Sequence, residues 1–415
     1  MTYLKNKHFP ITAGLDVHKN VIVCVILGAK DKTIKAKFAR NLEGIRLLIE
    51  HLKQHGCEQV VMESTGPYYR ILYDQLSAAG LNPHLVNALD NSNKGKIKTD
   101  FRDAERLARK FIAGEVKPSY VPKSPIKELR KLVRRRMKLV TIRTMLKNLV
   151  RAELDELVIP IDNLFSSLGK KARELLLTLT TSGDMEGLLS KYPALREKME
   201  AIERLVNTKI PEESALIISV LVKLMMEIDE AIKEIDRALR QIVIRNKKLL
   251  RSVELLMTIP GVGFIAAVTI IAEIGEISRF PSPKSLAMYA GLCPRIFQSG
   301  GRIYHGPLPW RCNKRLRWIM YQVAIALLRT RSQLKRFYER IKRRRGHKVA
   351  VIALARKIIV AIWCMLTRDE EWREGIKSPR RVPRVMVEKE TVLRAINLLR
   401  SLGYIVVKGG EGNVF

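Results

Sequence analysis

Acidic residues are scarce in this sequence: 41 Asp and Glu stand against 76 Lys and Arg, which gives 415 residues a formal net charge of +35 at pH 7. A compact chain with this excess repels itself and needs a polyanionic partner. Nucleic acid is the first candidate and an anionic membrane the second. Apolar residues nevertheless make up 47% of the chain, so wholesale disorder is excluded.

Long hydrophobic runs and cysteine pairs are also missing. The two most apolar stretches, residues 259–274 and 349–366, are interrupted by glycines or charged residues, whereas a membrane-spanning helix needs about 20 apolar residues. The five cysteines form no CxxC pair, which excludes a zinc ribbon and favours reduced thiols. A GxxxxGK[ST] loop and a GxSxG elbow are absent too, so ATP use and hydrolase chemistry are not indicated. We expect no membrane partner and a cytoplasmic location.

The first 118 residues predict an α/β domain. Strand-like segments come first, and helical and strand-like segments then alternate, which predicts a mixed sheet with helices packed on it. The predicted strands lie at 11–27 (a hairpin), 32–40, 57–65 and 81–88, and the helices at 42–52, 68–80 and 101–113.

Prolines 118, 122 and 125 mark a linker after this domain. We predict a helical coiled-coil assembly region, a mostly helical C-terminal domain and a tail of unassigned role that starts basic and holds a helix and a strand. The boundaries are 1–118, 119–250, 251–370 and 371–415, with the tail helix at 388–401 and the strand at 404–407.

Two long helices are predicted in the second region. In the first, at 126–157, Leu132, Leu139 and Leu146 recur every seven residues, as in a short coiled coil. The second, at 211–245, is its antiparallel or dimeric partner. The first helix also carries a dense run of cations, which predicts contacts to nucleic acid. The residues selected are Arg134, Arg135 and Arg136.

Four acids stand where metal chemistry needs them. Asp16 interrupts an apolar strand, Glu63 ends another, and Asp100 and Asp103 lie three residues apart at a helix start. Such carboxylates can hold two Mg²⁺ ions for phosphoryl transfer. The plainer alternatives are that Asp100 caps the helix and that Asp103 is a surface charge.

Two glycine-containing segments follow in the C-terminal region. Gly261 and Gly263 separate two helices, as in a helix-hairpin-helix turn whose N–H groups hold a DNA phosphate, or as in an ordinary turn. Ser299 lies in a glycine-rich, basic loop and is a candidate nucleophile toward DNA, although Ser-Gly is usually a turn. His305 is either its base or a polar loop residue. The cations behind the loop predict a phosphate-contacting face: Lys314, Arg315 and Arg317.

Together these motifs resemble the bridge-RNA-guided insertion-sequence transposases of the IS110 family. The resemblance rests on residues 14–19 (GLDVHK), 62–66 (MESTG), 98–104 (KTDFRDA), 292–300 (LCPRIFQSG) and 313–317 (NKRLR). It covers residues 10 to 370, and the ordered combination is more specific than any single motif.

The resemblance implies an RNase H-like, RuvC-like first domain with Asp16, Glu63, Asp100 and Asp103 as Mg²⁺ ligands. It further implies that Ser299 forms a covalent link to DNA and that the two halves make a composite site across subunits of a tetramer. The implied partners are donor and target DNA, a structured bridge RNA, and further copies of the chain, as a dimer or tetramer, in a prokaryotic cytoplasm near the nucleoid.

Two other functions remain open from the residues alone. A RuvC-type metal-dependent junction nuclease would use the same acids without the serine. A non-enzymatic nucleic-acid scaffold would need only the positive charge. Asp16 argues against the scaffold, because a scaffold has no need for a charge inside an apolar strand.

Overall fold

The computed structural model describes residues 11–28, 33–64, 66, 68–87, 99–159, 161, 165, 167–198, 210–299 and 302–373. The chain divides into two compact units, residues 1–122 and 123–415. The helix and strand predicted in the tail lie outside the described residues.

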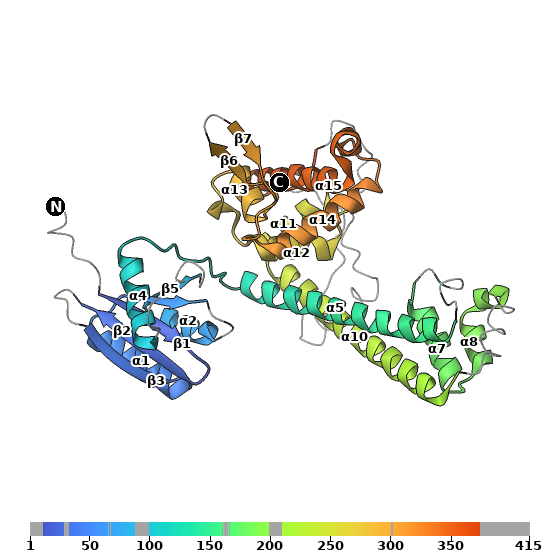
Figure 1. Ribbon diagram of the computed structural model, residues 1–415, viewed down its shortest axis with the longest axis horizontal. Helices are drawn as coiled ribbons and strands as arrows, with labels where there is room; N and C mark the ends of the chain where they lie inside the picture. Colours follow the sequence, from blue (N-terminus) through green and yellow to red (C-terminus); the bar gives the residue numbers. More distant parts are fainter. Residues whose placement is uncertain are drawn as a thin grey trace, which may run out of the picture. The chain divides into compact units, whose positions relative to one another are not determined.

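The first unit is built on a five-stranded mixed sheet, as predicted (Figure 1). Its strand order is β3-β2-β1-β4-β5; β1–β2 and β2–β3 pair antiparallel, whereas β1–β4 and β4–β5 pair parallel. This arrangement is compatible with the expected RNase H-like domain. The strands are β1 (Thr12–Val17), β2 (Val21–Leu27), β3 (Thr33–Ala39), β4 (Gln59–Glu63) and β5 (Asn82–Val86).

Helices cover both faces of this sheet. One face packs on two helices through buried residues such as Leu15, Met62 and Leu48. The opposite face packs, among the described residues, on the helix that contains Ala104, through residues such as Val25. The helices are α1 (Leu42–Gln54) and α2 (Tyr69–Ala78) on the first face and α4 (Asp100–Ile112) on the second.

Two long helices, α5 (Ile126–Glu156) and α10 (Glu212–Arg245), dominate the start of the second unit, as predicted. They pair antiparallel within one chain, since Arg136 bonds Asp236 and Arg143 bonds Asp229. The C-terminal half of α5 and the N-terminal half of α10 share a core with short helices. These are α7 (Lys170–Thr180), α8 (Met185–Lys191) and the 3₁₀ helix η1 (Pro193–Lys198).

The remaining helices form a second core together with the other ends of α5 and α10. α15 is long and apolar enough to cross a membrane by length and composition alone, but its buried residues join this core beside α13 and α14. The elements are α11 (Lys247–Met257), α12 (Phe264–Ile274), η2 (Ile277–Arg279), α13 (Pro283–Tyr289), β6 (Ile296–Ser299), β7 (Arg302–His305), α14 (Lys314–Leu328) and α15 (Leu334–Arg368).

Candidate functional site

Strand register brings Asp16 and Glu63 to neighbouring positions. β1 and β4 are parallel, with Leu15 beside Met62, so Asp16 and Glu63 are the next positions along the two strands. Leu15 and Met62 join the core under α1 and α2. Because side chains alternate along a strand, Asp16 and Glu63 belong to the opposite face, which α4 covers.

A glycine lets α4 approach this face closely. A Cβ at Gly14 would lie only 1.9 Å from the backbone oxygen of Ala104, so the helix rests directly on β1. Thr99 caps the helix by accepting a hydrogen bond from the Arg102 N–H. The alternative that Asp100 is the cap is therefore wrong: this residue opens the first turn, where a negative charge is favourable.

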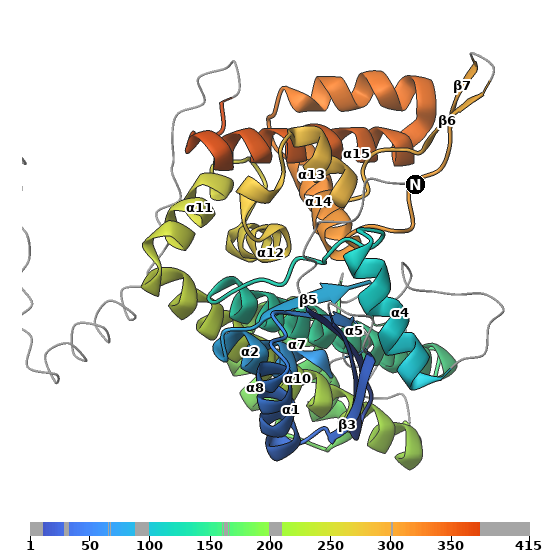
Figure 2. The ribbon, with the colours of Figure 1, turned by 90° about the vertical axis from the view of Figure 1, so that its left-hand side faces the viewer.

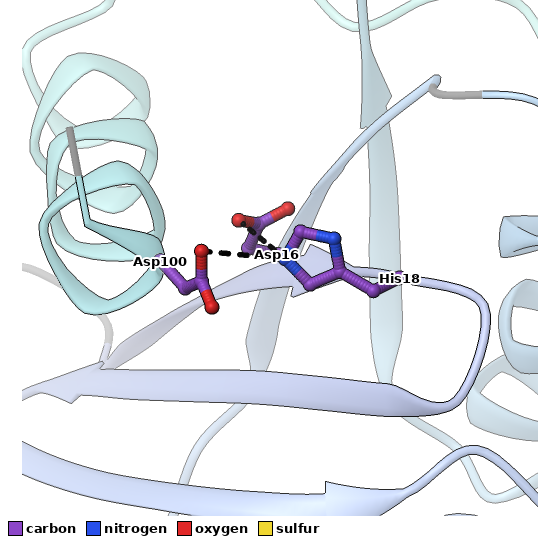
Figure 3. A group of neighbouring side chains, drawn as sticks. All are labelled: Asp16, His18 and Asp100. Carbon is purple, nitrogen blue, oxygen red and sulfur yellow. Dashed lines mark ion pairs between the residues drawn. The ribbon is translucent and has the colours of Figure 1, made fainter.

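His18 lies between two of the acids. Its Nε2 is 3.2 Å from Oδ2 of Asp16 and 3.6 Å from Oδ1 of Asp100, and Figure 3 shows one ring nitrogen directed toward both carboxylates. His18 is not among the residues predicted from the sequence. It directly follows β1, and its position continues the alternation of residues 14 and 16.

The charges of the four acids influence one another. Burial raises the pKa of Asp16; His18 opposes this rise, and the negative charges of Asp100, Asp103 and Glu63 add to it. The Asp103 side chain is 13% exposed and pairs with Arg106 at 2.7 Å. The structure thus gathers the four predicted acids around one end of β1.

This cluster fits a divalent cation. Single ligand atoms of Asp16, His18 and Asp100 lie within 4.8 Å of one another. Carboxylate oxygens are the ligands that Mg²⁺ prefers. Burial and the neighbouring acids raise the pKa of Asp16, and a cation would offset both effects. Chemically, such a site can stabilise charge on a phosphate undergoing transfer.

Ser299 occupies a strand and not the predicted loop. β6 and β7 form a two-stranded antiparallel ribbon in which Ser299 pairs with Arg302 and ends β6. Backbone bonds extend the ribbon past the strands, since Gly306 N donates to Arg295 O at 2.8 Å. In Figure 2 the ribbon projects from the helices α13 and α15. The loop prediction failed because two adjacent glycines in the sequence favour irregular backbone.

The start of α14 presents cations. Asn313 caps this helix by accepting from the Leu316 N–H at 3.0 Å, and Lys314 and Arg315 are exposed in its first turn. Arg317 is half-buried and donates to the Pro309 carbonyl and toward the Cys312 sulfur. The three predicted cations therefore differ: two face solvent, and the third also holds the preceding segment.

The arginines of α5 differ in the same way. Arg134 makes a bidentate pair with the fully buried Glu273, with both distances at 2.8 Å, and Arg136 bonds Asp236. Arg135, between them, is exposed. Glu273 also accepts from Asn313 at 2.9 Å, so this acid connects α5 and α12 to the cap of α14.

The turn between α11 and α12 contains the two predicted glycines. Gly261 has a φ of +85°, and a Cβ there would lie 3.0 Å from the Ala326 carbonyl carbon, so the glycine permits close packing on α14. Gly263 precedes α12 with open space where a Cβ would be. The first glycine thus has a packing role in this turn.

Two family models match the chain in order. Residues 13–159 match a DEDD transposase model of IS110 type, and residues 253–339 match the model described as "Transposase IS116/IS110/IS902 family". These matches define the class as transposase, the enzymes that cleave and rejoin DNA. Because the two matches keep this order and together cover more than half of the chain, the protein belongs to the IS110 family of transposases.

Several curated proteins resemble the chain over nearly their whole length. The insertion element IS116 44.8 kDa protein of Streptomyces clavuligerus is 25% identical over 88% of this chain and 97% of its own. The transposase for insertion sequence element IS1111A of Coxiella burnetii is 27% identical over 87% and 91%. A pilin gene-inverting protein of Moraxella bovis is 23% identical over 88% and 98%.

Proposed function

We propose that this protein is an insertion-sequence transposase that cuts and exchanges DNA strands with a Mg²⁺-bound carboxylate site and a serine nucleophile. The observation that carries the proposal is the gathering of Asp16, Glu63, Asp100 and Asp103 around one end of β1. A relative named for gene inversion adds support, since inversion and insertion both require strand exchange.

The carboxylates would hold two Mg²⁺ ions in an RNase H-like, RuvC-like first domain. When bound, the ions would supply charge stabilisation at the attacking and leaving oxygens of a phosphoryl transfer. The protein's own contribution is to keep the ligands in place: strand register fixes Asp16 and Glu63, and the contact at Gly14 fixes α4.

Ser299 would supply the nucleophile. A bond forms between its Oγ and the scissile phosphorus while the bond from phosphorus to the leaving deoxyribose oxygen breaks. The serine proton passes to a base and the leaving oxygen gains a proton, so the link conserves the phosphodiester's energy for rejoining. Whether His305 is that base is left open.

The DNA and RNA partners would contact the exposed cations. Arg135, Lys314 and Arg315 are exposed, whereas Arg134, Arg136 and Arg317 have partners within the protein and would contact phosphate through their remaining donors. The helix-hairpin-helix-like turn adds backbone N–H groups near Gly261 and Gly263. A bridge RNA would pair with donor and target DNA.

The long helices would assemble copies of the chain into a dimer or tetramer. Both carry exposed apolar side chains that the α5–α10 pair leaves uncovered. These are Met145, Leu149, Leu216, Val220 and Leu224. A partner's coiled coil could cover them, in a cytoplasmic, nucleoid-associated complex.

Strand exchange with purified full-length variants tests the proposal. Ser299→Ala should still bind DNA but lose the denaturation-resistant protein–DNA adduct and strand exchange, and Asp16→Asn should lose exchange as well. Cutting without an adduct in the wild type would instead indicate the junction nuclease. RNA extraction from the purified protein tests guidance: full activity on DNA alone would contradict the bridge RNA.

A further inference from the structure

The ribbon that carries Ser299 exposes an aromatic pair. Phe297 and Tyr304 are directly opposite each other in the β6–β7 register. Opposite residues of an antiparallel ribbon share a face, and these two side chains are 53% and 56% exposed. Large aromatic side chains are usually covered in a folded chain, so this pair calls for a ligand.

The serine position belongs to the same face. Positions 297 and 299 are two apart on β6, and positions 302 and 304 are two apart on β7, with Ser299 paired to Arg302. Because strand faces alternate with a period of two, the serine is the next position on the aromatic face toward the turn.

The aromatic face is partly prearranged. A Cβ at Gly306 would lie 2.6 Å from Cε2 of Phe297, so the ring rests over this glycine while its other side remains exposed. The bond from Gly306 N to Arg295 O holds the ribbon closed beneath the ring.

Charge identifies the ligand class. No aspartate or glutamate occurs between Glu276 and Glu339, a stretch that contains the whole ribbon. Exposed cations follow the ribbon at Arg311, Lys314 and Arg315. An apolar protein partner would not require this one-sided charge, whereas aromatic rings among cations are the usual platform for unpaired nucleobases.

We infer that Phe297 and Tyr304 stack an unpaired base of the DNA strand beside the position of Ser299, and so hold the strand for attack. The inference rests on the proposed function, because the base is placed relative to the proposed nucleophile. Stacking requires a π-face, which distinguishes it from apolar cover of the ribbon.

The test uses full-length protein, a chelator to prevent cleavage, and single-stranded DNA carrying the fluorescent base 2-aminopurine. Phe297→Leu and Tyr304→Leu keep apolar volume but remove the ring, and each should weaken binding about tenfold and relieve quenching of the base. Phe297→Trp should bind at least as tightly as the wild type. The matched control is Ile296→Ala, since Ile296 is 62% exposed and occupies the opposite face; its affinity should change less than about twofold.

Wild-type affinity and quenching in both leucine variants would overturn the inference, and so would an equal loss in Ile296→Ala. A changed sedimentation coefficient of the leucine variants without DNA, with quenching intact, would assign the face to a protein contact and also overturn it. Failure of this inference can be distinguished from failure of the proposed function. If Ser299→Ala still exchanges strands while the stacking results are as expected, only the assignment of Ser299 as nucleophile is wrong.

Discussion

Asp16 and Glu273 are both acids among apolar neighbours, yet their pKa values shift in opposite directions. Burial is the main cause that raises the pKa of Asp16; His18 lowers this pKa, and Asp100, Asp103 and Glu63 raise it further. Burial also pushes the pKa of Glu273 upward, but Arg134, with Asn313 and Arg130, outweighs burial and leaves this pKa below its ordinary value.

The difference separates a binding site from a structural contact. Glu273 already has its cations, so its charge is used to join α5, α12 and α14. Burial and the neighbouring acids both disfavour the ionised form of Asp16, and a bound cation would offset that cost.

Removing the charge of Asp16 should abolish function without harming the fold. Asp16→Asn should lower strand exchange about a thousandfold or more, since a metal ligand is lost. Its unfolding free energy should stay equal to the wild type's or rise, because like-charge repulsion is relieved. Exchange assays and urea unfolding measure the two effects. An Asp16→Asn variant that is destabilised but still active would show that Asp16 has a structural role and not a functional one.

Removing the charge of Glu273 should do the opposite and harm the fold. Glu273→Gln leaves Arg134 without its counter-charge and should lower the free energy of unfolding by about 3 kcal/mol. Asp236→Asn, which disturbs the more exposed pair with Arg136, should cost about 1 kcal/mol or less. Equal losses in the two variants would show that the buried acid has no special structural role.

Filling the contact at Gly14 should connect packing to function. A Cβ at this position overlaps the backbone oxygen of Ala104, so Gly14→Ala should push α4 from β1 at a cost of about 1–3 kcal/mol. Exchange should fall because Asp100 and Asp103 move with the helix. Gly114, at a helix end, gives a control, because nothing lies within 4 Å of a Cβ there. Gly114→Ala should lower the free energy of unfolding only through backbone strain at its φ of +71°. Normal strand exchange by a folded Gly14→Ala variant would contradict the proposal that the contact at Gly14 positions Asp100 and Asp103.

The opposite pKa shifts of Asp16 and Glu273 predict that the two acids affect stability in opposite ways as the pH changes. The pKa of Glu273 is lowered in the folded state, so its contribution is complete above the ordinary value of 4.5 and is lost as the pH falls through the folded pKa. The stability difference between wild type and Glu273→Gln should therefore be constant from about pH 7 to 5 and shrink below that. The folded pKa of Asp16 is raised above its ordinary value of 3.8. Ionisation of Asp16 therefore lowers the free energy of unfolding as the pH rises from 3.8 through the folded pKa. A difference for Glu273→Gln that grows on acidification would contradict the sign.

Much of the architecture could be predicted because it is encoded locally. The apolar, β-branched residues of 11–27, with a His-Lys-Asn turn among them, predicted the β1–β2 hairpin, and the predicted helix at 211–245 agrees with α10. The positions of two candidate metal ligands could be predicted for the same reason, since Asp16 interrupts an apolar strand and Glu63 ends another.

Other features depend on contacts that no local pattern contains. The partner of Arg134 is 139 residues away and that of Arg136 is 100 residues away, so both arginines looked like unpaired cations in the sequence. The β6–β7 ribbon was missed because four-residue strands beside two glycines give too little alternation to distinguish a strand from a loop.

Mass spectrometry of the protein–DNA adduct can decide whether Ser299 attacks DNA with the help of the carboxylate site. Full-length protein is incubated with its DNA and Mg²⁺, denatured and digested with nuclease and protease. We expect a nucleotide attached through phosphate to the peptide containing Ser299, and no such peptide from Asp16→Asn. A nucleotide on another residue, or an adduct of unchanged yield in Asp16→Asn, would contradict it.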